Sequence, residues 1–83
     1  MNYPVVVDVS LRPGIADPEG ATIERALPAL GFTGVSAVRA GKSFRLVIDA
    51  PDEAAALARA RALADRLLSN PVIEVATVRA GES

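Results

Sequence analysis

The chain has 83 residues with 51% hydrophobic and 4% aromatic content, a formal net charge of −1, and neither cysteine nor histidine. That length predicts one small domain over residues 1–83, and a domain this small often depends on a metal or a partner subunit. The missing cysteine excludes disulfides, and the missing histidine removes the usual metal ligand and acid–base group. The slightly acidic charge offers no basic field for nucleic acid. Because there is also no long apolar run, we expect a cytoplasmic protein without a membrane partner.

The first predicted element is a strand over residues 3–10, which read YPVVVDVS. The opposite sides of this strand differ, since one is mixed and the other is wholly apolar, formed by Tyr3, Val5, Val7, Val9 and Leu11. This pattern is typical of a strand with one face in the core and the other partly wet. The Arg12-Pro13-Gly14 triplet then breaks the strand.

A helix is predicted to begin at Asp17-Pro18, with Asp17 as the N-cap and Pro18 as the first helical residue. Gly14 and Gly20 would allow a phosphate to approach the loop over residues 11–23. However, Pro18 removes a backbone donor, and Asp17 and Glu19 repel an anion. We therefore interpret the loop as a helix start. The helix carries one apolar stripe at helical spacing, formed by Ile23, Ala26, Leu27 and Leu30.

Two further strands are predicted over residues 35–40 and 43–49, and the short link Ala40-Gly41-Lys42-Ser43 predicts a hairpin between them. Arg39 and Lys42 make this hairpin basic. It either holds a phosphate or carboxylate of a partner, or it is a solvated turn in which Gly41 supplies a positive φ. The residues alone favour the solvated turn.

A second helix is predicted to begin after its cap Asp52 and to stop at Asn70-Pro71, followed by a last strand over residues 72–78 and a frayed polar tail over 79–83. The order β-α-β-β-α-β predicts an α+β, ferredoxin-like sandwich: a four-stranded antiparallel sheet with two helices on one face. The other face would present Val6 and Val47, with Ile73 and Val75 nearby. We expect a second copy or another subunit to cover this face.

No catalytic group stands out. Glu74 is a lone acid on a strand without a second titrating group, and the hydroxyl residues have no histidine or suitable lysine to activate them. We therefore expect no catalytic residue, no metal and no cofactor bound by this chain.

Three segments together resemble the PurS family: Asp17-Pro-Glu-Gly20, Val38-Arg-Ala-Gly-Lys42 and Leu67-Leu-Ser-Asn-Pro-Val-Ile-Glu74. The resemblance covers nearly the whole chain, from Val5 to Glu74. The chain departs from the family pattern at Ala40 and Ala76, where larger residues are common. Candidates for shaping or making subunit contacts follow from the matching positions: Asp17, Pro18, Gly20, Arg39, Gly41, Lys42, Asn70, Ile73 and Glu74.

The resemblance implies a division of labour in phosphoribosylformylglycinamidine synthase, an enzyme of purine biosynthesis. A large ligase subunit uses ATP, with Mg²⁺, to activate the amide of formylglycinamide ribonucleotide, and a glutaminase subunit releases ammonia from glutamine. PurS would be the non-catalytic subunit, a homodimer or tetramer that bridges the two and assists ammonia transfer.

Two alternatives share the same element order. An ACT-like regulatory module binds small metabolites at dimer edges, and Gly14 and Gly20 after the first strand keep that hypothesis open. An RNA-recognition module needs aromatic residues on its central strands, where this chain has aliphatic and acidic ones.

Overall fold

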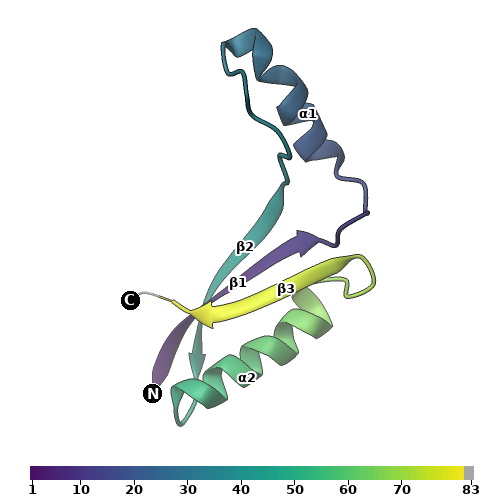
Figure 1. The fold of residues 1–83 in the computed structure, drawn as a ribbon. Helices are drawn as coiled ribbons and strands as arrows, with labels where there is room; N and C mark the ends of the chain where they lie inside the picture. Colours follow the sequence, from purple (N-terminus) through teal and green to yellow (C-terminus); the bar gives the residue numbers. More distant parts are fainter. Residues whose placement is uncertain (82–83) are drawn as a thin grey trace.

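A three-stranded antiparallel sheet with strand order β2-β1-β3 forms the body of the protein. The computed structural model describes residues 1–81. Figure 1 shows a helix, α2, packed on one face of this sheet, and a second helix, α1, standing away from it. The elements follow in chain order as β1 (Asn2–Leu11), α1 (Pro18–Ala26), η1 (Pro28–Leu30), β2 (Gly41–Asp49), α2 (Glu53–Leu63), η2 (Ala64–Leu68) and β3 (Glu74–Ala80).

The hydrophobic core lies between β1 and α2. Val5, Val7 and Val9 on the central strand are the largest fully buried side chains, as the alternating pattern predicts. Small residues on α2 and at the start of η2 let this helical segment approach the sheet closely, and three of them have no exposed surface: Ala56, Ala60 and Ala64. Residues of the flanking strands complete the layer, since Val7 pairs with Phe44 on β2 and with Val78 on β3.

Local sequence determines where α2 begins and ends. The Asp52 side chain accepts a hydrogen bond from the Ala55 N–H at 2.7 Å, which caps the helix as predicted. At the other end, the last turn widens into η2, where the Ser69 N–H donates to the Ala64 carbonyl at 2.9 Å. Asn70-Pro71 follows and ends the helix, also as predicted.

The predicted strand over residues 35–40 is absent, so the expectation of four strands and a 40–43 hairpin is wrong. Residues 35–40 instead run back along α1. Two of their backbone N–H groups donate to side chains of that helix and of its N-cap. The Val38 N–H donates to Glu24 Oε1 at 2.9 Å, and the Ala40 N–H donates to Asp17 Oδ2 at 2.8 Å. Ala37 has a φ of 57°, which interrupts any extended run.

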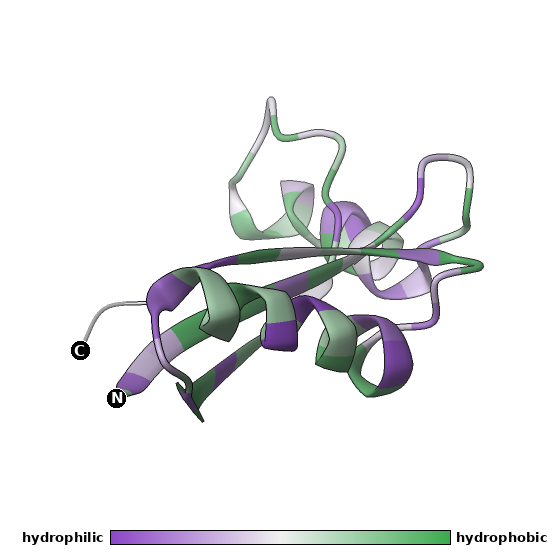
Figure 2. Ribbon diagram, turned by 90° about the horizontal axis from the view of Figure 1, so that it is seen from below, coloured by the Kyte–Doolittle hydropathy of each residue, from purple (hydrophilic) through white to green (hydrophobic). Residues whose placement is uncertain are grey.

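Helix α1 does not cover the sheet, contrary to the prediction of two helices on one face. With residues 12–40 it forms a projection, here called the arm, that rises on the side of the sheet opposite to α2 (Figure 2). The radius of gyration is 16.1 Å, against about 12 Å for a compact domain of this length. Gly20 is the arm's one buried residue. Four of its large apolar side chains are exposed, from 44% to 69%: Ile23, Leu30, Phe32 and Val35.

The last strand also differs from the prediction. Val72 and Ile73 belong to the turn before β3, which starts at Glu74 and continues through Arg79 to Ala80. The predicted polar tail over 79–83 is therefore partly strand, and residues 82–83 lie outside the described part of the chain. No helix within residues 1–81 is long and apolar enough to cross a membrane.

Candidate functional site

The three sequence segments singled out above meet at one end of the sheet. The strand register places the end of β1 beside the starts of β2 and β3, because Ser10 pairs with Gly41 and Leu11 pairs with Glu74. The arm leaves the sheet at this same end (Figure 1). We call this region the arm junction. It is formed by Arg12 and the nine candidates Asp17, Pro18, Gly20, Arg39, Gly41, Lys42, Asn70, Ile73 and Glu74.

Asp17 accepts the hydrogen bonds that hold together the part of the junction within the arm. Its Oδ1 accepts from the Gly20 N–H at 3.0 Å and so caps α1, while its Oδ2 accepts from the Ala40 N–H at 2.8 Å. Arg39 Nε lies 4.0 Å from the same Oδ2. The hydrogen bond from Gly20 contributes most to lowering the pKa of Asp17 below its ordinary value. The hydrogen bond from Ala40 and the charge of Arg39 lower this pKa further. Pro18 opens the helix as its first residue.

Gly20 is the contact point between α1 and the returning segment. A Cβ at this position would lie 2.5 Å from the Val38 carbonyl oxygen and 2.6 Å from Asp17 Oδ2. Only glycine fits so close an approach. The Val38 carbonyl and the Asp17 side chain therefore occupy the space directly beside Gly20.

Lys42 and Glu74 join the opposite edges of the sheet across β1. Lys42 Nζ lies 3.6 Å from Glu74 Oε2, and the Glu74 side chain is only 14% exposed. Glu74 Oε1 also accepts from the Asn70 N–H at 2.7 Å, so this carboxylate shapes the turn before β3. The interpretation of Gly41 as a turn glycine with a positive φ is wrong. Gly41 has no positive φ, and a Cβ there would lie 2.7 Å from the Val9 carbonyl oxygen.

Arg12 links the two halves and was missed by the sequence analysis, which treated it as part of a strand break. Its guanidinium donates twice to the Pro71 carbonyl, at 3.0 and 2.8 Å, and its backbone N–H donates to the Ile73 carbonyl at 2.8 Å. Its own carbonyl accepts from Arg39 Nη2 at 3.5 Å. A cation directly after a strand was the available signal, but its partner lies 59 residues away in the sequence.

The arm junction holds backbone segments in position and presents an apolar surface beside them. Leu67, Val72 and Ile73 are 74%, 80% and 36% exposed. Within residues 1–81 no three carboxylate, histidine or cysteine side chains gather in a way that could hold a metal ion. This arrangement suits recognition by another protein, because the carboxylates of Asp17 and Glu74 are paired with cations of the chain while apolar side chains beside them face outward.

Comparison with known proteins identifies the family. Residues 4–82 match the family model described as PurS: Phosphoribosylformylglycinamidine (FGAM) synthase. The chain is 48% identical over 73 residues to the PurS subunit of Mycobacterium leprae, covering 88% of this chain and 89% of that protein. With the Synechocystis PurS subunit it shares 44% identity over 73 residues, covering 88% of this chain and 73% of that protein.

Solved structures agree with the sequence matches. The Thermotoga maritima PurS subunit has a TM-score of 0.90 at 33% identity, covering 98% of this chain and 93% of that one. A chain in the Thermotoga maritima PurLQS structure also gives a TM-score of 0.90 at 33% identity, covering 98% of this chain and 99% of that one. The resemblance inferred from three short segments is thereby confirmed: this chain belongs to the PurS family of phosphoribosylformylglycinamidine synthase subunits.

Proposed function

We propose that this chain is the non-catalytic small subunit of phosphoribosylformylglycinamidine synthase, acting in the cytoplasm to bridge the ligase and glutaminase subunits and to assist ammonia transfer between them. ATP and Mg²⁺ would bind to the ligase subunit. Similarity to a chain of the PurLQS structure supports the subunit role. The observation that carries the bridging role is the arm, which exposes its apolar residues and has almost no core of its own.

The exposed arm also supports self-association into a homodimer or tetramer. A segment of nearly thirty residues with a single buried position gains little hydrophobic stabilisation in an isolated chain. Large exposed apolar patches on small domains are typical of protein interfaces. We infer that another protein surface covers the arm in the working assembly.

The arm junction candidates divide into two roles in this proposal. Asp17 and Gly20 shape the arm from inside, since the Asp17 side chain is 6% exposed and Gly20 is buried. Arg39 and Lys42 offer charge to a partner, with side chains 45% and 56% exposed. Ile73 contributes an apolar contact beside them. A partner would thus touch the second group, and would depend on the first only through the arm's shape.

Reconstitution tests the proposed function. The purified ligase and glutaminase subunits are assayed for amide transfer to formylglycinamide ribonucleotide with ATP, using either glutamine or ammonium chloride as the nitrogen source. We expect this chain to be inactive alone, to raise the glutamine-dependent rate strongly, and to leave the ammonium-dependent rate nearly unchanged. An undiminished glutamine-dependent rate without this chain would refute the bridging role.

A further inference from the structure

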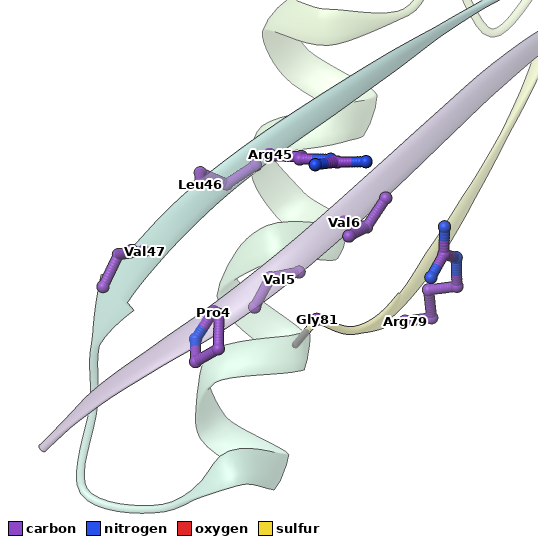
Figure 3. Close-up of a pocket in the computed structure, with 8 residues that line it drawn as sticks. All are labelled: Pro4, Val5, Val6, Arg45, Leu46, Val47, Arg79 and Gly81. Atoms are coloured by element: carbon purple, nitrogen blue, oxygen red, sulfur yellow. The ribbon is translucent and has the colours of Figure 1, made fainter. Parts of the chain in front are cut away.

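A hollow in the arm is not explained by the roles above, whereas a hollow on the sheet is. The sheet hollow has a volume of about 520 Å³, and Val6 stands there between Arg45 and Arg79 on the neighbouring strands (Figure 3). It lies on the face that we expect a second copy or another subunit to cover, so its occupant is a protein surface. The arm hollow, of about 430 Å³, lies between α1 and the returning segment 35–40 and is here called the arm cavity.

The arm cavity has the size of a small-molecule site, since such sites span about 300–1,000 Å³. Its wall comes from the approach to α1, from α1 itself and from the returning segment. Each stretch contributes an alanine whose short side chain leaves space open: Ala16, Ala21 and Ala37. Ala37 has a φ of 57°, a conformation that is unfavourable for any residue except glycine. Strained residues of this kind gather at binding sites.

Two neighbouring charges in the arm cavity have no ionic partner. Glu24 Oε1 accepts from the Val38 N–H at 2.9 Å, and its other oxygen has no donor among residues 1–81. The Arg25 side chain donates one hydrogen bond within the same range, to Thr22 Oγ1 at 3.3 Å. Neither Glu24 nor Arg25 forms an ion pair with a residue that the structure describes.

These two charges determine the chemistry of the occupant. The other charged residues of the cavity, Asp17 and Arg39, approach within 4.0 Å and compensate each other. An occupant with a single charge would therefore satisfy only one of Glu24 and Arg25. A molecule with a cationic and an anionic group satisfies both through charge-assisted hydrogen bonds. Ile15 and the alanines add an apolar wall that suits an aliphatic side chain.

The arm cavity stays accessible when a protein covers the apolar side of α1. Successive residues of a helix are rotated by about 100°, so Ala21 and Arg25, each two positions from Ile23, lie about 160° away from it. A surface packed against Ile23 approaches the helix from the side opposite to the cavity. The self-association included in the proposed function therefore does not occupy this site.

We propose that the arm cavity binds an α-amino acid with an aliphatic side chain, its ammonium group on Glu24 and its carboxylate on Arg25. This inference goes beyond the proposed function, because a bridging subunit needs no small-molecule ligand. The bound molecule would lie between α1 and the returning segment. Since it would bind only when these two are together, it should also slow amide exchange at Val38.

Titration of the full chain tests the need for both charges, with NMR amide shifts as the readout. Three probes are compared at about pH 6.5, where free α-amino groups are protonated. L-Leucine carries both charges, L-leucinamide lacks the carboxylate, and N-acetyl-L-leucine lacks the ammonium group. We expect L-leucine to shift the amides of Ala21, Arg25 and Ala37 saturably, and the other two probes to bind at least about tenfold more weakly.

Neutral variants test the two residues. Glu24→Gln keeps an acceptor for the Val38 N–H, and Arg25→Gln keeps a polar side chain, so both preserve the arm. Each should weaken L-leucine binding at least about tenfold. Glu53→Gln and Arg66→Gln are the matched controls, because both residues are exposed on the other helical segment, and they should leave the affinity unchanged.

Each contrary result overturns the proposal. Absence of a saturable shift with L-leucine would show that the cavity is not an amino-acid site. Equal binding of L-leucinamide or N-acetyl-L-leucine would show that one of the two charges is not used. Unchanged affinity in Glu24→Gln and Arg25→Gln would place the site elsewhere. Since this titration is made without the ligase and glutaminase subunits, its failure leaves the reconstitution result for the proposed function intact.

Discussion

Replacing Gly20 by alanine tests how the arm is held together. In an ordinary helix this change stabilises by about 1 kcal/mol, since glycine is a poor helix former. Here the new Cβ would lie 2.5 Å from the Val38 carbonyl oxygen, about 0.9 Å short of the 3.4 Å at which ordinary contact begins. The helix and the returning segment would have to separate, which strains the Ala40–Asp17 and Val38–Glu24 hydrogen bonds.

Overpacking costs about 1–3 kcal/mol, and the upper value applies because a backbone oxygen cannot swing aside. Subtracting the gain in helix propensity leaves a net destabilisation of about 2 kcal/mol for the contact between α1 and the returning segment. The equilibrium constant for separating the two would therefore rise about 30-fold. Amide hydrogen exchange should therefore accelerate by about that factor at Val38 and Ala40 but not at Val7 in the core. Thr22→Ala, on an exposed position of the same helix, should cause no acceleration. Equal or slower exchange in the Gly20→Ala chain would refute the close contact.

Three further predictions concern the core, the pH dependence and the turn. Ala60→Leu should lower the free energy of urea unfolding by about 1–3 kcal/mol, because Ala60 has no exposed surface, whereas Ala62→Leu on the exposed side should change it little. The pKa of Asp17 is lowered in the folded chain, so its stabilising effect is complete above the unfolded value near 3.8 and is lost as the pH falls through the lower folded value. Exchange at Ala40, corrected for intrinsic rates, should therefore accelerate below about pH 4, and Asp17→Asn should abolish that dependence. Glu74→Ala should destabilise the chain by about 1–2 kcal/mol in urea, since a turn N–H loses its acceptor, and Glu74→Gln, which keeps an acceptor, should lose less.

Much of the fold follows from short-range sequence signals. The caps Asp17 and Asp52, the alternation along β1 and the stop at Asn70-Pro71 each act within a few residues, and each was predicted correctly. The arm was not predictable in this way. An apolar stripe such as that of α1 shows that a helix has a face to bury, but it does not say whether the covering surface belongs to the same chain.

The missing strand has a related cause. The segment over residues 35–40 has the composition of a strand, yet strand formation needs a neighbouring strand with free backbone groups. In this chain Asp17 and Glu24, which lie 23 and 14 residues before their partners, accept hydrogen bonds from the N–H groups of Ala40 and Val38. The close approach of Gly41 to Val9 could not be predicted from nearby residues either, because it depends on strand pairing and not on a local turn.

The candidate site was located by resemblance, and its internal contacts became clear only in three dimensions. The sequence could not pair Lys42 with Glu74, because the two lie on different strands and are joined across β1. Arg12 was overlooked for the same reason, since the carbonyl of Pro71 carries no side-chain signal. Contacts between a side chain and a distant backbone group leave no pattern in a single sequence.

Light scattering coupled to size exclusion tests the bridging role most directly. The ligase and glutaminase subunits are run together with and without this chain, in the presence of glutamine and ATP. The account predicts separate peaks for the two large subunits alone, and one species containing all three components when the chain is added. Co-elution of the ligase and glutaminase without this chain, or elution of this chain apart from both, would contradict it.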